Sequence, residues 1–197
     1  MVVIDNKFDR KLETYEKKNQ ILLTHTSRNI LDYVQSLKYR LNGNYSKIPH
    51  FIISRDGKIV QLLETNMVSN FFPDNNINKT SIIISLENLG WLEKQPLKNY
   101  YINWIGNIYK EKVFERKWRD YFFWQPYTDE QMKQCVNLIK DLSKKYDINL
   151  KCIGHNTRLK GSEKFQGILT ESNFNEFSTN LSPAFDFEKF EKYLKDE

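Results

Sequence analysis

The sequence contains little cysteine, proline and glycine, and each shortage excludes a class of protein. Two cysteines, Cys135 and Cys152, among 197 residues provide neither a disulfide framework nor the spacing of a zinc finger, and we expect buried thiols because both lie in apolar stretches. Five prolines and seven glycines exclude collagen-like and low-complexity chains. No apolar run approaches the length of a membrane span, so we expect no membrane-spanning segment.

Aromatic residues and positive charge are present instead. The aromatic fraction of 14% excludes a disordered chain, because disordered chains lack the large side chains that build a core. The length suits a single domain over residues 1–197. The net charge of +5 permits attraction to an anionic polymer, but the charges are dispersed and no nucleic-acid-binding motif occurs. We therefore expect no nucleic-acid partner.

Hydrophobic spacing in the first half of the chain predicts alternating strands and helices. Residues 20–25 form a short apolar run typical of a buried strand. Residues 27–42 have helical spacing, with Ser27 as the expected N-cap and Gly43 as the stop. Residues 50–63 predict a hairpin around an Asp-Gly turn, and residues 80–87 predict a central strand.

The second half predicts two further helices. Residues 128–146 have one apolar face and begin with a capping box of Thr128 and Gln131. We expect a short strand at 151–155, a long polar loop over 156–182, and a closing helix capped by Asp186. This order predicts an α/β fold in which a central mixed β-sheet is flanked by helices.

Residues 88–127 interrupt the pattern and contain all four tryptophans. We expect an aromatic-rich insertion that packs on the main sheet. Such side chains form a small core of their own or present flat apolar faces to a sugar, and the sequence leaves both roles open.

The chain has three histidines, and two of them, His25 and His155, end predicted strands. A zinc hydrolase needs about three protein ligands and an open position for water. No paired His or Cys spacing occurs, so spacing alone favours structural roles for each histidine.

Six segments nevertheless occur together in one order, and they resemble a known family. They are residues 22–27 (LLTHTS), 49–59 (PHFIISRDGKI), 81–88 (SIIISLEN), 127–131 (YTDEQ), 153–155 (IGH) and 179–186 (TNLSPAFD). Over about residues 20–192 the chain resembles the zinc-dependent N-acetylmuramoyl-L-alanine amidases of the phage-lysozyme and peptidoglycan recognition protein family. The resemblance implies a zinc in a groove and cleavage of the amide between N-acetylmuramic acid and L-alanine.

By position, the resemblance implies that His25 is the first zinc ligand and His155 the second. The third position, Asp or Cys in the family, is Asn180, whose neutral amide oxygen is a poorer ligand. His50 matches a position that is not usually a ligand, so we expect a groove or core role.

Two more positions depart from the family pattern. Ser85 stands where a Glu is frequent, and Ser178 stands where a Lys is expected. These family groups would activate the zinc-bound water and stabilise the oxyanion. Glu87 lies on the same strand face as Ser85 and either supplies the missing carboxylate or is a polar strand end.

These residues favour an altered but active zinc amidase that acts on peptidoglycan or muropeptide as a monomer. The alternative is a catalytically degenerate module that binds peptidoglycan or another partner. The polar start of the chain resembles no secretory signal, so we expect cytoplasmic residence, with lysis as the route to the cell wall.

Overall fold

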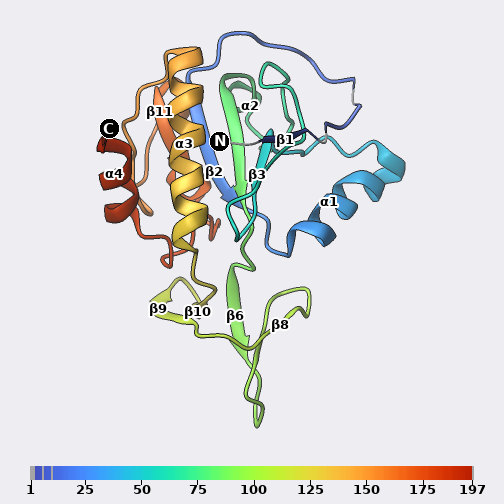
Figure 1. Ribbon diagram of the computed structural model, residues 1–197, viewed down its shortest axis with the longest axis vertical. Helices are drawn as coiled ribbons and strands as arrows, with labels where there is room; N and C mark the ends of the chain where they lie inside the picture. The colour runs from blue at the N-terminus through green and yellow to red at the C-terminus, as the bar shows by residue number, and fades with distance from the viewer. Residues whose placement is uncertain (1–2, 6, 10, 197) are drawn as a thin grey trace.

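The computed structural model describes residues 3–5, 7–9 and 11–196, and its centre is a mixed six-stranded β-sheet (Figure 1). The strand order is β1-β4-β3-β5-β2-β11, in which only β3 and β4 pair antiparallel. The strands are β1 (Val3–Asp5), β2 (Gln20–His25), β3 (Phe51–Ile53), β4 (Ile59–Gln61), β5 (Ser81–Leu86) and β11 (Gly167–Thr170). The predicted mixed α/β architecture is confirmed.

Helices cover both faces of this sheet because alternate strand residues are apolar on each side. One face packs against α3 (Asp129–Tyr146) and α4 (Phe187–Lys195), where residues such as Leu23 and Ile84 are completely buried. The other face packs against α1 (Ile30–Tyr39) and the short α2 (Asn75–Thr80). Short 3₁₀ turns occupy Arg40–Gly43, Ser162–Lys164 and Glu171–Asn173.

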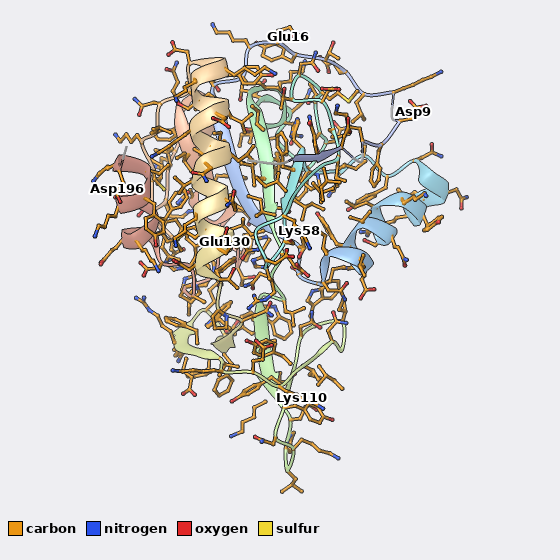
Figure 2. The ribbon with its side chains drawn as sticks, viewed as in Figure 1. Asp9, Glu16, Lys58, Lys110, Glu130 and Asp196 are labelled. Carbon is orange, nitrogen blue, oxygen red and sulfur yellow. The ribbon has the colours of Figure 1, made fainter. Side chains whose placement is uncertain are left out.

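The predicted hairpin is the antiparallel pair β3 and β4. Its turn requires glycine at position 57, where φ is +83° and an added Cβ would lie 2.8 Å from the side chain of Glu130 on α3. Figure 2 shows Lys58 and Glu130 close together at the end of the central sheet nearest to the insertion. The tight turn therefore lets the hairpin pack against α3.

The aromatic-rich insertion forms a second sheet beyond the end of the first, rather than packing on its face (Figure 1). Its antiparallel order is β8-β7-β6-β10-β9. The strands are β6 (Trp91–Lys94), β7 (Tyr101–Ile102), β8 (Ile108–Tyr109), β9 (Phe114–Trp118) and β10 (Tyr121–Trp124). Leu92 and Tyr109 belong to a small core, and Trp124 is completely buried.

Several predicted boundaries are wrong. Asn29, not Ser27, caps α1, because its side chain accepts the Asp32 N–H. The strand expected at 151–155 is reduced to an isolated bridge from Cys152 to Ile168. The loop expected at 156–182 contains β11, which pairs with β2 and completes the sheet.

The predicted capping box at α3 is half present. The Thr128 hydroxyl accepts the Gln131 N–H, as expected. The Gln131 amide, however, donates to the carbonyls of Ile53 and Glu87 instead of returning to the cap. This buried glutamine ties α3 to the ends of β3 and β5. In the described part of the chain, no helix has the length and apolarity to cross a membrane.

His50 lies in the core and has both ring nitrogens hydrogen bonded. Nδ1 accepts the Ile83 N–H at 3.0 Å, and Nε2 lies 2.9 Å from the Met67 carbonyl, to which it donates. Burial, together with the positive charge of Lys18, lowers the pKa of His50 to about 3. The imidazole is therefore neutral in the folded protein at neutral pH.

This burial predicts a loss of stability in acid. The unfolded chain takes up a proton at His50 below its ordinary pKa of 6.5, whereas the folded protein does so only near pH 3. The stabilisation is complete above pH 6.5 and falls by about 1.4 kcal/mol per pH unit and per histidine below it. We expect urea unfolding between pH 8 and pH 4 to show this decline. We expect His50→Gln to be less stable at pH 8. Its free energy of unfolding should fall less steeply with decreasing pH, because unfolding takes up one proton fewer. Equal pH dependence in the variant and the parent would contradict the role given to His50.

Candidate polar site at the strand ends

His25 ends β2 at the side of the sheet that faces the insertion, and only 6% of it is exposed. Its Nδ1 lies 3.3 Å from the Tyr127 hydroxyl. Gly90 packs on the other side of the ring, where a Cβ would come within 2.9 Å of Nε2. Burial lowers the pKa of His25 to about 3, so the ring is neutral.

Asn180 lies directly beside this strand end and uses both ends of its amide. Its Oδ1 accepts the main-chain N–H of His25 at 2.9 Å, and its Nδ2 donates to a carboxylate oxygen of Glu171 at 3.0 Å. Its own main-chain N–H donates to the Ser178 hydroxyl at 3.1 Å. If the amide were flipped, its NH2 group would face the His25 N–H and its oxygen would face the Glu171 carboxylate. Both contacts would be repulsive, so the orientation of the amide is fixed.

Glu171 is a site residue that the sequence did not indicate. It follows β11 directly, and the parallel register that pairs Thr170 with Leu23 brings it to the same end of the sheet as His25. Its second carboxylate oxygen accepts from the Asn175 side chain at 3.0 Å. The sequence feature that could have indicated Glu171 is the short strand segment 167–170 just before it. This segment lies inside the region that was expected to be a loop. His25, Asn180 and Glu171 together are called the strand-end cluster below.

Glu87 and Ser85 lie at a different place, under α1. The two Glu87 oxygens accept the main-chain N–H groups of Ile30, at 2.9 Å, and of Arg55, at 3.0 Å. Ser85 is completely buried in β5 on the same side, and its hydroxyl has no hydrogen-bond partner among the described residues. The carboxylate of Glu87 therefore joins the start of α1 to the β3–β4 turn. The catalytic roles of Ser85, Glu87 and Ser178 stay predictions.

His155 packs among aromatic rings instead of joining the strand-end cluster. Its ring centroid lies 4.6 Å from that of Trp118 and 5.9 Å from that of Phe187. Burial, together with the charges of Arg116 and Arg119, lowers the pKa of His155 to about 4. Its Nε2 is buried without a hydrogen-bond partner among the described residues.

A cleft of about 460 Å³ opens beside His155, between β9 and the start of α4. Its lining consists of Phe114, Arg116, His155, Pro183, Ala184, Phe185, Asp186, Phe187 and Glu188. A second cleft of about 500 Å³ lies near α2 and includes Arg158 and Phe177. The cleft beside His155 is the better candidate for a ligand, because it combines aromatic rings, charges of both signs and an unsatisfied buried nitrogen. It is called the His155 cleft below.

The fold and the strand-end cluster define an amidase-like α/β protein. Residues 13–165 match the family Amidase_2, described as N-acetylmuramoyl-L-alanine amidase, and the chain belongs to this family. The resemblance seen in the sequence is therefore confirmed. A comparison with curated protein sequences gives no match.

Solved structures of low sequence identity share the fold. N-acetylmuramoyl-L-alanine amidase LysC from Clostridium intestinale URNW has a TM-score of 0.61 at 17% identity, over 100% of this chain and 99% of that one. AmiD from E. coli, an N-acetylmuramyl-L-alanine amidase in complex with its substrate, has a TM-score of 0.55 at 14% identity, over 94% and 61% of the two chains. The complex of peptidoglycan recognition proteins LCa and LCx with tracheal cytotoxin has a TM-score of 0.57 at 13% identity, over 94% of this chain and 92% of that one.

Members of the family are generally zinc-dependent, but the residues at the strand-end cluster do not fit a zinc ion. Asn180 offers only a neutral amide oxygen, which is a poorer ligand than a carboxylate or thiolate and accepts the His25 N–H, and its nitrogen donates to Glu171. His155, the second ligand that the resemblance implies, packs against the Trp118 ring. Across residues 3–5, 7–9 and 11–196, no three His, Cys, Asp or Glu side chains are grouped so that they could hold a metal ion.

Proposed function

We propose that this chain binds peptidoglycan or muropeptides through the amidase-family fold and does not hydrolyse them by zinc-activated water. The observation that carries the proposal is the amide of Asn180, which bonds to His25 and Glu171 at the place where the family has an anionic ligand. The sequence alone favoured an active zinc amidase. The alternative is supported because the third ligand position holds a neutral amide, which is a poorer zinc ligand than the carboxylate or thiolate of the family.

The neighbouring structures support peptidoglycan fragments as the ligand class. AmiD is titled with anhydro-N-acetylmuramic acid-L-Ala-D-γ-Glu-L-Lys as its substrate, and the recognition proteins are titled with tracheal cytotoxin. In this chain the His155 cleft offers Phe114, which is 36% exposed, as an apolar face on which a sugar ring can stack. Binding through aromatic and polar contacts requires no metal.

Incubation with purified, insoluble peptidoglycan tests this proposal. We expect the protein to sediment with the polymer and to release no new L-alanine amino termini, with or without added Zn²⁺, under conditions in which an active family amidase releases them. New termini would establish hydrolysis and overturn the proposal, and a protein that stays in the supernatant would remove peptidoglycan as the ligand.

A matched pair of variants locates the binding surface. Phe114→Ala removes a ring from the His155 cleft, and we expect affinity for muropeptide to fall about fivefold, because one aromatic contact contributes about 1 kcal/mol. Phe177→Ala is the control, since Phe177 is 84% exposed and lines the other cleft. A larger effect of the control would move the binding surface to the second cleft.

A further inference from the structure

The β6–β7 hairpin of the insertion projects away from the body of the molecule. Figure 1 shows it as the part of the second sheet that lies farthest from the central sheet. Lys94 of β6 pairs with Tyr101 of β7, and the turn between the strands is closed by a hydrogen bond from the Lys98 N–H to the Gln95 carbonyl. The central sheet therefore does not obstruct the approach of this turn to a flat surface.

Three lysines gather around this turn. They are Lys94, Lys98 and Lys110, and the chain between the first and the last contains no Asp or Glu. Tyr101 pairs with both Lys94 and Tyr109, so the antiparallel register places Lys110, which directly follows β8, toward the turn, and Figure 2 labels Lys110 on the projection. All three lysines are exposed, and within the part of the chain that the structure describes none of their ammonium groups forms an ion pair. The fold thus concentrates charge that is dispersed in the sequence.

A leucine occupies the apex of the same turn. Leu97 is completely exposed and has a φ of +59°, a left-handed backbone conformation that is costly for a leucine. Its side chain lies in solvent, so it adds no buried apolar surface to the folded protein. Ile108, which pairs with Ile102 in the neighbouring strands, is 57% exposed as well. The projection therefore presents apolar side chains together with unpaired positive charges.

We propose that the hairpin tip, defined as residues 94–98 with Lys110, docks onto the surface of an anionic lipid bilayer. Lysines beside a bilayer attract its negatively charged headgroups, and apolar side chains enter the boundary between headgroups and acyl chains. A soluble polyanion would match the lysines, but it has no apolar phase to receive Leu97. The proposal does not depend on the proposed function, since no residue of the tip lines the His155 cleft.

Co-sedimentation of the full chain with lipid vesicles tests the docking. One set of vesicles contains phosphatidylglycerol and phosphatidylcholine in equal amounts, and the other contains phosphatidylcholine alone. At low salt we expect the protein to partition at least tenfold more strongly onto the anionic vesicles. Most of this preference should disappear at about 0.5 M salt, because salt screens charges in solvent. Equal partitioning onto both vesicles, or binding to neither, would overturn the proposal.

A matched pair of triple variants assigns the effect to the hairpin tip. We expect the combined replacement of its three lysines by glutamine to lower partitioning onto anionic vesicles at least tenfold, since each lysine contributes about fivefold. The control removes the same charge near the start of β2, at the opposite end of the central sheet, by replacing three exposed lysines with glutamine: Lys17, Lys151 and Lys164. If the control weakens partitioning as much, overall charge is responsible and the docking site is wrong.

The variant Leu97→Asn separates a lipid surface from a soluble polyanion. Asparagine tolerates a positive φ, so the turn is kept, and the net charge does not change. We expect about tenfold weaker partitioning onto anionic vesicles, with unchanged binding to soluble polyphosphate. Leu41→Asn is the matched control, because Leu41 is also exposed, has a φ of +52° and lies outside the insertion. If Leu97→Asn binds vesicles as tightly as the parent, the lysines recognise anionic charge alone and docking onto lipid is overturned.

Discussion

Replacing Asn180 with aspartate is expected to destabilise the protein by about 2–3 kcal/mol when divalent cations are absent. The new carboxylate keeps the bond from the His25 N–H, but its second oxygen replaces the N–H donor that lies 3.0 Å from Glu171. Two carboxylates at this distance repel each other, and one of them must take up a proton or move away. Urea unfolding at neutral pH with a chelator measures the loss.

Two further variants isolate the cause. Adding Glu171→Gln to Asn180→Asp removes the repulsion, so we expect most of the stability to return. Asn175→Asp is the matched control, because Asn175 donates to the other Glu171 oxygen at 3.0 Å and does not contact His25. We expect it to be destabilising as well. An Asn180→Asp protein as stable as the parent would contradict the hydrogen-bond assignment.

The same substitution is expected to create a response to metal. The introduced aspartate would add an anionic oxygen between the main chain of His25 and the carboxylate of Glu171, and histidine nitrogens and carboxylate oxygens are ligand types that zinc accepts. A cation that binds only the folded protein raises its stability. Zn²⁺ should therefore raise the melting temperature of Asn180→Asp by several degrees and leave the parent and Asn175→Asp unchanged. A similar rise for the parent would show that the present residues already hold zinc.

Glu87→Ala is expected to cost about 2–4 kcal/mol of folding free energy, because it leaves two main-chain N–H groups without acceptors. The carboxylate accepts from Ile30 and Arg55, and so joins the start of α1 to the β3–β4 turn. Thermal and urea unfolding measure the loss, and a smaller loss is expected for Glu87→Gln, which keeps one oxygen.

The control for Glu87 is Glu93→Ala in the insertion, an exposed strand position at which we expect a change below about 0.5 kcal/mol. A residue kept only for catalysis would leave stability unchanged when removed. Full stability of Glu87→Ala would therefore favour the catalytic interpretation of this carboxylate over the structural one.

The positions that catalysis would require support the fold in this chain. The Ser178 hydroxyl accepts the Asn180 N–H, and Glu87 supports α1. Ser85 is buried in the central strand. Glu87 and Ser178 accept hydrogen bonds from main-chain N–H groups that would otherwise lack a partner within the protein, and such bonds stabilise the fold. The geometry therefore gives Glu87 and Ser178 a structural role without any reaction.

Local patterns predicted much of the fold correctly. The Asp-Gly pair predicted the β3–β4 hairpin, because a tight turn needs a residue that accepts a positive φ. The amphipathic run predicted α3 to within one residue, since its buried face follows the helical period and Thr128 caps it. The six ordered segments predicted the family, which the match over residues 13–165 confirms.

Other features depended on contacts that no local pattern contains. The four residues of β11 are too short a run to be distinguished from a loop, and they become a strand only because β2 offers a free edge. The predicted insertion has its own sheet beyond the strand ends because its aromatic residues form a separate core. Its Trp118 ring then packs on His155.

The sequence by itself determined the class of fold, the family and the position of His25 at a strand end, because these follow from hydrophobic period and short motifs. Only the tertiary structure decided what Asn180 does. Its partners are 155 and 9 residues away along the chain, and the β2–β11 register brings both to one end of the sheet. An asparagine can donate, accept or coordinate, and the choice depends on which groups the fold places within about 3 Å of its amide. Here those groups are an N–H and a carboxylate, so the amide bonds to both and joins β2 to the segment after β11.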